Sequence, residues 1–133
     1  MRIAIDVLAI LSPESRNRGI GIYATNLLKE LFKSDRENEY FLLNFHDNKS
    51  LKEILAFSEN VSEDYFEIAG NSSLRYDPNF KQVLGNVISN YILKKDIDLF
   101  LITSPLDSYF PFEKKWFGNT PVIGIVYDIK SDP

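Results

Sequence analysis

Short apolar runs rich in β-branched residues alternate with longer amphipathic segments along this chain, and that alternation constrains the fold more than any other feature. Short apolar runs predict strands, and apolar residues spaced three and four apart predict helices. Strands that alternate with helices favour right-handed βαβ crossovers and a mostly parallel sheet. We therefore predict an α/β fold: a Rossmann-like parallel sheet flanked by helices, forming a single domain over residues 1–133.

The first predicted strand, Arg2–Leu8, is apolar at both odd and even positions. That pattern is typical of a strand buried on both faces of a parallel sheet. Asp6 lies inside it, and we expect a buried carboxylate with a partner. The other predicted strands are Tyr40–Phe45, the weaker Tyr65–Ala69, Asp98–Ile102 and Val122–Val126.

Apolar stripes predict two main helices, from about Gly21 to Lys33 and from the Asp77-Pro78 pair to about Lys94. A capping-box spacing at Ser50 predicts a short helix that ends near Phe57. The polar segment Leu11–Arg18 and the segment Thr103–Asn119 are expected to be loops. Five aromatic residues crowd the segment Thr103–Asn119, and we expect them to pack it onto the core: Tyr109, Phe110, Phe112, Trp116 and Phe117. The alternative is an apolar surface for an acceptor or a partner.

The charge and cysteine content exclude several kinds of function. The net charge is −4, from 19 acidic and 15 basic residues, which argues against a general nucleic-acid binder. Cysteine is absent, so the chain has no disulfide and no thiol ligand. No His, Asp and Glu residues show metal-ligand spacing, so we expect no metal; His46, the sole histidine, lies in an expected exposed turn.

Targeting and membrane signals are also absent from the sequence. No apolar run approaches the roughly 20 residues of a membrane-spanning helix. Met1–Leu11 resembles a signal peptide, but Asp6 interrupts its apolar run. We therefore expect a cytoplasmic protein without a membrane-spanning segment. A peripheral contact with a membrane is an open alternative.

Two glycines stand directly before the first predicted helix, in the run Arg18-Gly19-Ile20-Gly21-Ile22-Tyr23-Ala24. Glycine lets a backbone approach a ligand closely, and a helix start offers unpaired N–H groups with a partial positive charge. These properties suit a phosphate or sugar phosphate, to which Arg16 and Arg18 would add charge-assisted contacts. The alternative is a glycine-rich helix start that binds nothing.

Ligands of open α/β sheets bind beyond the carboxyl ends of the strands. The segments expected at that edge are Ser12–Gly21, His46–Lys49, Thr103–Ser108 and Tyr127–Lys130. Asp128 directly follows the last predicted strand, where its carboxylate would accept sugar hydroxyls or act as a base. The equally weighted alternative for Asp128 is a helix cap or a turn.

The letters Gly19-Ile20-Gly21-Ile22-Tyr23-Ala24 also fit the dinucleotide fingerprint G-x-G-x-x-A, which keeps an NAD(P)-binding domain of an oxidoreductase as one alternative. The spacing argues against it, because about ten residues of polar loop separate the glycines from the first predicted strand. The acidic residue expected after the second strand is also poorly placed, since Asp47 follows His46 in an expected turn.

The order of features resembles the N-terminal domain of a GT-B glycosyltransferase of the family 4-like (group 1) type. Members carry a glycine segment of the form R/G-G-I-G-R-Y that opens a helix, and here Arg18–Tyr23 followed by Asn26–Leu31 matches, with Ile22 in place of an arginine. A late strand of the family usually ends in His-Asp, where this chain has Tyr127-Asp128. A second family histidine is also missing, near Thr103-Ser104-Pro105.

The resemblance implies a two-domain enzyme that moves a sugar from a nucleotide-sugar to a glycan, lipid or protein acceptor, with retention and without a further cofactor. This chain would be the acceptor-side half, inactive alone, and the nucleotide-sugar domain would lie outside it. Asp128 would be the catalytic residue, and the substrate-binding residues would be Arg18, Gly19, Ile20, Gly21, Tyr23, Ser104 and Tyr127. The substituted histidines keep a non-catalytic, partner-binding domain as a further alternative.

Overall fold

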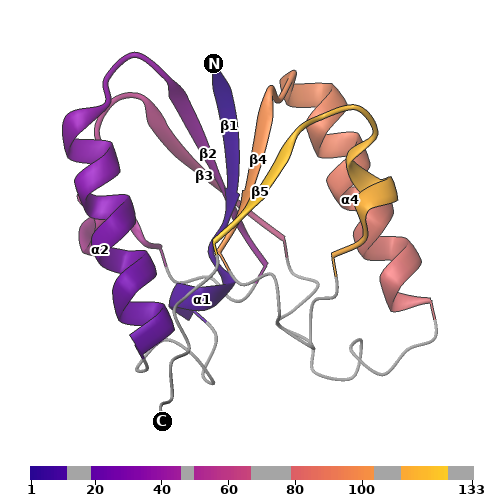
Figure 1. Cartoon of the computed structure of the whole chain (residues 1–133), viewed down its shortest axis with the longest axis horizontal. Coiled ribbons are helices and arrows are strands. Elements are labelled where there is room, and N and C mark those ends of the chain that lie inside the picture. Colours follow the sequence, from indigo (N-terminus) through magenta and orange to yellow (C-terminus); the bar gives the residue numbers. More distant parts are fainter. Residues whose placement is uncertain (12–18, 46–49, 67–78, 104–111, 126–133) are drawn as a thin grey trace, which may run out of the picture.

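A five-stranded, all-parallel sheet forms the centre of the computed structural model (Figure 1), which describes residues 1–11, 19–45, 50–66, 79–103 and 112–125. The strand order is β3-β2-β1-β4-β5. This arrangement confirms the predicted α/β, Rossmann-like fold. The strands are β1 (Arg2–Asp6), β2 (Glu39–Asn44), β3 (Val61–Tyr65), β4 (Leu99–Ile102) and β5 (Val122–Gly124).

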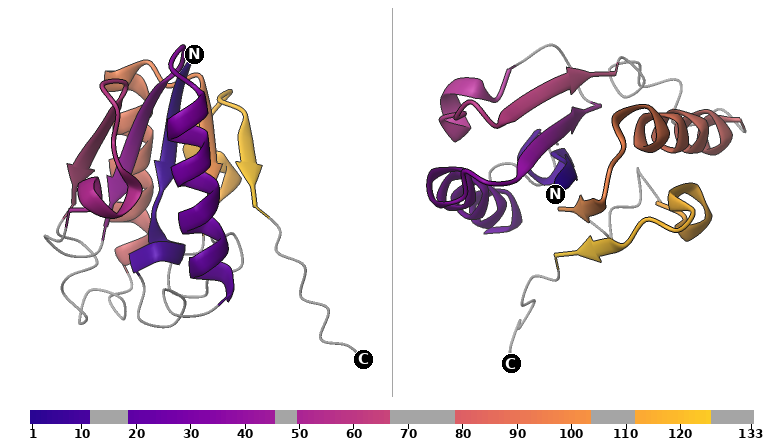
Figure 2. Two further views of the ribbon diagram at one scale, coloured as in Figure 1. Left: turned by 90° about the vertical axis from the view of Figure 1, so that its left-hand side faces the viewer. Right: turned by 90° about the horizontal axis from the view of Figure 1, so that it is seen from above.

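Helices cover both faces of the sheet (Figure 2). The helix α2 (Gly19–Ser34) and the short α3 (Lys52–Leu55) pack on one face, and α4 (Phe80–Lys95) and the 3-10 helix η2 (Lys114–Phe117) on the other. A short helix, α1 (Leu8–Leu11), follows β1 directly. Right-handed crossovers explain the division, because the chain moves one way across the sheet from β1 to β3 and the other way from β3 through β4 to β5.

Alternate residues of the central strands enter two separate cores. Ile3 and Ile5 of β1 pack towards α2, whereas Ala4 packs with Phe100 of β4 towards α4. The neighbouring strand β2 repeats this alternation. The expectation that the first strand is buried on both faces is therefore confirmed.

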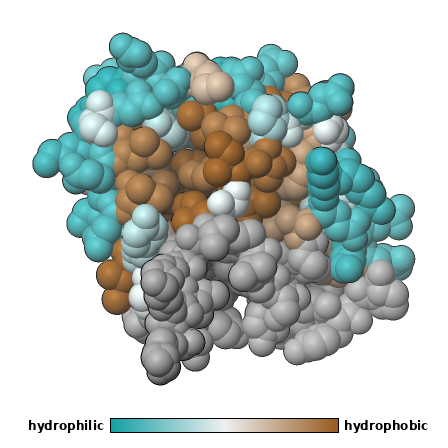
Figure 3. Space-filling model, in the orientation of Figure 1, coloured by the Kyte–Doolittle hydropathy of each residue, from teal (hydrophilic) through white to brown (hydrophobic). Residues whose placement is uncertain are grey.

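Among the described residues, no helix covers the α2 side of the sheet over β4 and β5. Leu99 and Leu101 of β4 are only partly buried there, and Ile123, paired in register beside Leu101, is 51% exposed. Figure 3 shows apolar side chains gathered across this side of the molecule. No described helix has the length and apolarity needed to cross a membrane.

Arg2, at the start of β1, bonds to the carboxyl end of α4 and to the turn before β4. Its backbone N–H donates to Asp98 Oδ2 (2.8 Å), and its Nε donates to the Lys95 carbonyl oxygen (2.5 Å) at the end of α4. The guanidinium also lies 4.7 Å from the ring centroid of Phe41. A cation at a helix C-terminus is favourable there, because the last carbonyls carry partial negative charge.

Several sequence expectations need correction. The predicted strand Tyr65–Ala69 is wrong, because the third strand is Val61–Tyr65. The first strand ends at Asp6 rather than Leu8, and α1 follows it where no helix was predicted. The capping box at Ser50 is absent, since α3 begins at Lys52 with no side-chain cap and Ser50 Oγ accepts from the Lys52 N–H instead.

The aromatic loop packs as expected. Trp116 and Phe117 are 7% and 3% exposed, and the Phe112 ring lies edge-on to Trp116 and tilted against Phe117 and Phe100. Tyr109 and Phe110 lie outside the described residues. The packing is tight, because a Cβ built on Gly85 of α4 would lie 2.3 Å from Trp116 Nε1.

We predict that Gly85→Ala destabilises the fold by about 1–3 kcal/mol, since the added methyl overpacks a rigid indole. Gly19→Ala is the matched control, because a Cβ at Gly19 meets no atom within 4 Å. The control should be neutral or stabilising by up to about 1 kcal/mol, the ordinary gain of replacing a helical glycine. Urea unfolding measures both variants, and equal changes in their free energies of unfolding would contradict the packing argument.

Candidate functional site

The strand order reverses between β1 and β4, and this switch point marks the place where open α/β sheets bind ligands. The connection after β1 returns to β2 on one side, and the connection after β4 goes to β5 on the other. The site is therefore built from the carboxyl ends of these two strands and the segments that follow them.

A buried carboxylate joins the two strand ends. Asp6, the last residue of β1, accepts from the Thr103 N–H (2.7 Å to Oδ2) and from the Thr103 hydroxyl (3.0 Å to Oδ1). Both residues are fully buried. The expectation of a buried, partnered Asp6 is confirmed, and the two bonds repay part of the cost of removing the carboxylate from water.

The same hydroxyl reaches the helix that follows β1. The Ala9 N–H of α1 donates to Thr103 Oγ1 (3.3 Å), and α1 packs against α2. Three segments that are remote in sequence are thereby joined at one edge of the sheet: the end of β1, the end of β4 and the start of α1.

The helix α2 begins at this edge with the glycine pair (Figure 1). Gly19 is exposed, Gly21 is buried, and Ile20 packs partly into the core beside α1. The first turn contains no acidic side chain that would offset the helix dipole. Its leading N–H groups lack intrahelical acceptors by geometry, so the arrangement can receive an anion.

Four of the predicted substrate-binding residues lie in the first turns of α2, and their role in binding stays a prediction: Gly19, Ile20, Gly21 and Tyr23, the last of these 54% exposed. Arg18, His46, Ser104, Tyr127 and Asp128 lie outside the described residues, and their roles stay predictions. Sequence analysis assigned no role to Thr103, which the structure pairs with Asp6. One feature of the sequence could have indicated this pairing: Thr103 directly follows the predicted strand Asp98–Ile102, and Asp6 lies in the predicted first strand.

The end of β2 holds a structural polar cluster. Asn44 is buried and donates from Nδ2 to Glu63 Oε2 of β3 (2.9 Å). Glu63 also accepts from the Ser50 hydroxyl (3.0 Å) and the Leu51 N–H (3.2 Å). A dinucleotide-binding domain usually places an acidic residue here for the ribose hydroxyls. This chain instead has a buried amide whose side chain is already bonded.

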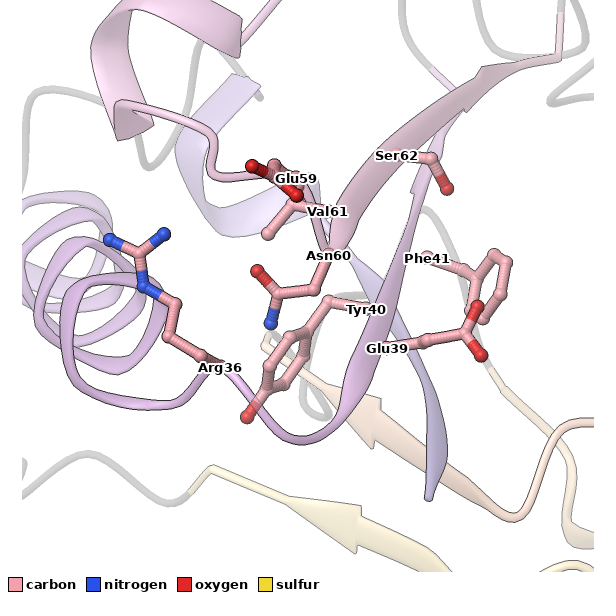
Figure 4. A pocket seen from close by; sticks show the side chains of 8 residues that line it. All are labelled: Arg36, Glu39, Tyr40, Phe41, Glu59, Asn60, Val61 and Ser62. Atoms are coloured by element: carbon pink, nitrogen blue, oxygen red, sulfur yellow. The ribbon is translucent and has the colours of Figure 1, made fainter.

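A pocket of about 580 Å³ opens at the opposite, amino edge of the sheet, beside the starts of β2 and β3 (Figure 4). Its polar groups serve the turn before β2. The Asn60 amide donates to the carbonyl oxygens of Asp35 (2.9 Å) and Asn38 (2.7 Å), and its Oδ1 accepts from Ser58. We assign this pocket a structural role, because the Asn60 side chain already makes hydrogen bonds that hold the turn before β2.

The Asp35 carboxylate organises the same turn. It accepts from the Tyr40 hydroxyl (2.5 Å), the Asn38 amide (2.7 Å) and the Glu37 N–H (2.9 Å). These bonds, the one from Tyr40 foremost, hold the pKa of Asp35 well below its usual range. Burial, together with the bond to Asp35, raises the pKa of Tyr40.

Within the described part of the chain, no three His, Asp or Glu side chains are grouped so that they could hold a metal ion. Comparisons of the chain with protein-family models, curated proteins and solved structures find no match. The candidate site therefore rests on topology and on the contacts described above.

We predict an acid-sensitive contribution of Asp35 to stability. Because its folded pKa lies below the unfolded value of about 3.9, the contribution is present above pH 4 and is lost as the pH falls below it. Urea midpoints of the wild type and Asp35→Asn, measured from pH 7 to pH 2, should differ at neutral pH, and the difference should shrink as the pH falls from 4 to 2. A difference that is independent of pH would contradict this assignment.

Proposed function

We propose that this chain is the N-terminal, acceptor-side domain of a retaining GT-B glycosyltransferase, which transfers a sugar from a nucleotide-sugar to an acceptor. The observation that carries the proposal is the position of the glycine start of α2 at the carboxyl edge of the sheet beside the switch point, where Gly19 is exposed. The resemblance of Arg18–Tyr23 to the family's glycine segment supplies the reaction class. The cysteine-free sequence supports a cytoplasmic location.

Sugar transfer from a nucleotide develops negative charge on the departing diphosphate. Preorganised N–H donors stabilise such charge, and a helix start supplies them together with the positive end of its dipole. The residues Gly19–Leu28 carry no charged side chain, so this helix can orient a phosphate without neutralising it. We infer that a second domain, closing over the same edge, supplies the cations and excludes water.

In this proposal the remaining predicted residues act around the glycine start. Asp128 accepts hydrogen bonds from sugar hydroxyls or acts as the base, and Arg18, Ser104 and Tyr127 contact substrate. The missing family histidines favour a route in which the leaving phosphate itself takes the acceptor's proton. No further cofactor is required by this route.

The strand order also suits a dinucleotide-binding domain, which is the second candidate. Two observations weigh against it. Residues 7–18, including α1, separate β1 from the glycines, whereas a pyrophosphate-binding turn should follow the strand directly. The end of β2 offers the bonded Asn44 in place of an acidic residue.

The open apolar face over β4 and β5 is the observation that favours the third candidate, a non-catalytic domain that binds another protein. A surface of this kind marks a place where protein packs. The proposed enzyme also needs such packing against its second domain, so the face alone does not favour the third candidate over the first.

We predict that Gly19→Glu abolishes nucleotide-sugar binding while the fold persists. The added carboxylate would occupy the phosphate position, and an acidic residue in the first turn of a helix is otherwise favourable. Asn26→Glu is the matched control, because it places the same charge on an exposed position further along α2. NMR titration of the 133-residue chain with UDP-glucose and GDP-mannose should shift the amides of Gly19, Ile20 and Gly21 in the wild type and the control.

Three outcomes would contradict the proposal. Tighter binding of NADH than of every nucleotide-sugar would favour the oxidoreductase domain. Binding that survives Gly19→Glu would remove the glycine start from the site. Sugar transfer by the isolated chain would contradict the expected division of labour between two domains.

A further inference from the structure

The buried Asp6–Thr103 pair has no part in the chemistry proposed above, although it lies at the same edge of the sheet. Both side chains are fully buried, and a buried carboxylate is costly unless its bonds are good. Its bonds are short and link residues 97 positions apart in the chain. Neither group is exposed to a ligand, so a role in binding has to act through other residues.

The directions of the hydrogen bonds connect three segments in series. The Thr103 hydroxyl has a single proton, which it gives to Asp6 Oδ1. Its oxygen accepts from the Ala9 N–H of α1, and the Thr103 N–H donates to Asp6 Oδ2. The hydroxyl therefore sets the position of α1 relative to the ends of β1 and β4.

The helix α1 extends this series of contacts to the glycine start. Ala9 and Ile10 of α1 are buried in the same core as Ala24 and Leu28 of α2, and Ile20 packs partly against that core. The views in Figures 1 and 2 agree that α1 lies beside the first turns of α2. A shift of α1 would move the leading amides of α2, because close-packed interiors transmit displacement.

We propose that Asp6 and Thr103 are positioning residues: through α1 they hold the Gly19–Gly21 start of α2 at a fixed place relative to the end of β4. The inference rests on the proposed function for the identity of the ligand, and the mechanical coupling stands apart from it. Binding sites tolerate little error in the placement of their donors, and misplacement by about 1 Å can reduce a rate by about a hundredfold.

The test compares Thr103→Val, which removes the hydroxyl at nearly constant shape, with Thr103→Ser, which keeps it. Tyr91→Phe is the matched control, because it deletes a partly buried hydroxyl that bonds to Asp64 of β3 (2.7 Å), on the far side of β2 from β1. Each variant is characterised by its thermal midpoint, its amide NMR spectrum and its affinity for UDP-glucose and GDP-mannose.

We expect Thr103→Val to shift the amides of Gly19, Ile20 and Gly21 and to weaken nucleotide-sugar binding by about tenfold or more. Thr103→Ser should keep the wild-type amide positions and the wild-type affinity. Tyr91→Phe should lower the thermal midpoint without changing those amide positions or that affinity. An unchanged affinity in Thr103→Val, or equal losses in Thr103→Val and Tyr91→Phe, would overturn the positioning role.

The spectra separate failure of this inference from failure of the proposed function. If the wild type binds neither nucleotide-sugar, the proposed role of the glycine start in donor binding fails for these donors, and the amide shifts still decide the coupling. Shifts in Thr103→Val that reach Gly19–Gly21 and disappear in Thr103→Ser support it. Shifts confined to α1 and to the ends of β1 and β4 overturn it.

Discussion

Everything at the candidate site depends on the parallel hydrogen bonding of β1 between β2 and β4. Its residues pair with both neighbours in one register, so that Ile5 lies beside Leu42 on one side and Leu101 on the other. Parallel pairing makes all the strands end at the same edge, and the reversal of strand order opens that edge between β1 and β4. Because α2 must return from the carboxyl edge to the amino edge, its glycine start lies at that edge by topology alone.

The sequence predicts the parts of the fold that are governed by local pattern. Strands β1, β2 and β4 and helices α2 and α4 carry long apolar signals, and the structure has all of them. Strand β3 was misplaced because it is an edge strand with the acidic residues Glu63 and Asp64. Its acidic side chains are bonded to partners remote in sequence: Glu63 accepts from the Leu51 N–H, and Asp64 accepts from the Tyr91 hydroxyl. Such bonds leave no trace in the local sequence.

The candidate site likewise has one part that local sequence predicts and one part that depends on residues remote in sequence. The position of the glycines follows from strand and helix order, which the sequence predicts. The pairing of Asp6 with Thr103 depends on the register of two strands that are remote in sequence, and no local pattern records a register. The helix α1 was missed for a similar reason: Leu-Ala-Ile-Leu reads equally well as a continued strand, and the bond from Ala9 to Thr103 is one contact that favours the turn into a helix.

Charge sets a limit on what this fold can do by itself. A helix start is equivalent to roughly half a positive charge, whereas a departing nucleoside diphosphate carries at least two negative charges. The uncharged stretch Gly19–Leu28 cannot make up that difference, and the buried Asp6 behind it is acidic. The carboxyl edge is thus suited to holding a phosphate in place and poorly suited to neutralising it. In the proposal Arg16 and Arg18, which directly precede this helix in the sequence, would supply part of the missing charge. The rest is assigned to a second domain, so this fold does not carry the whole reaction.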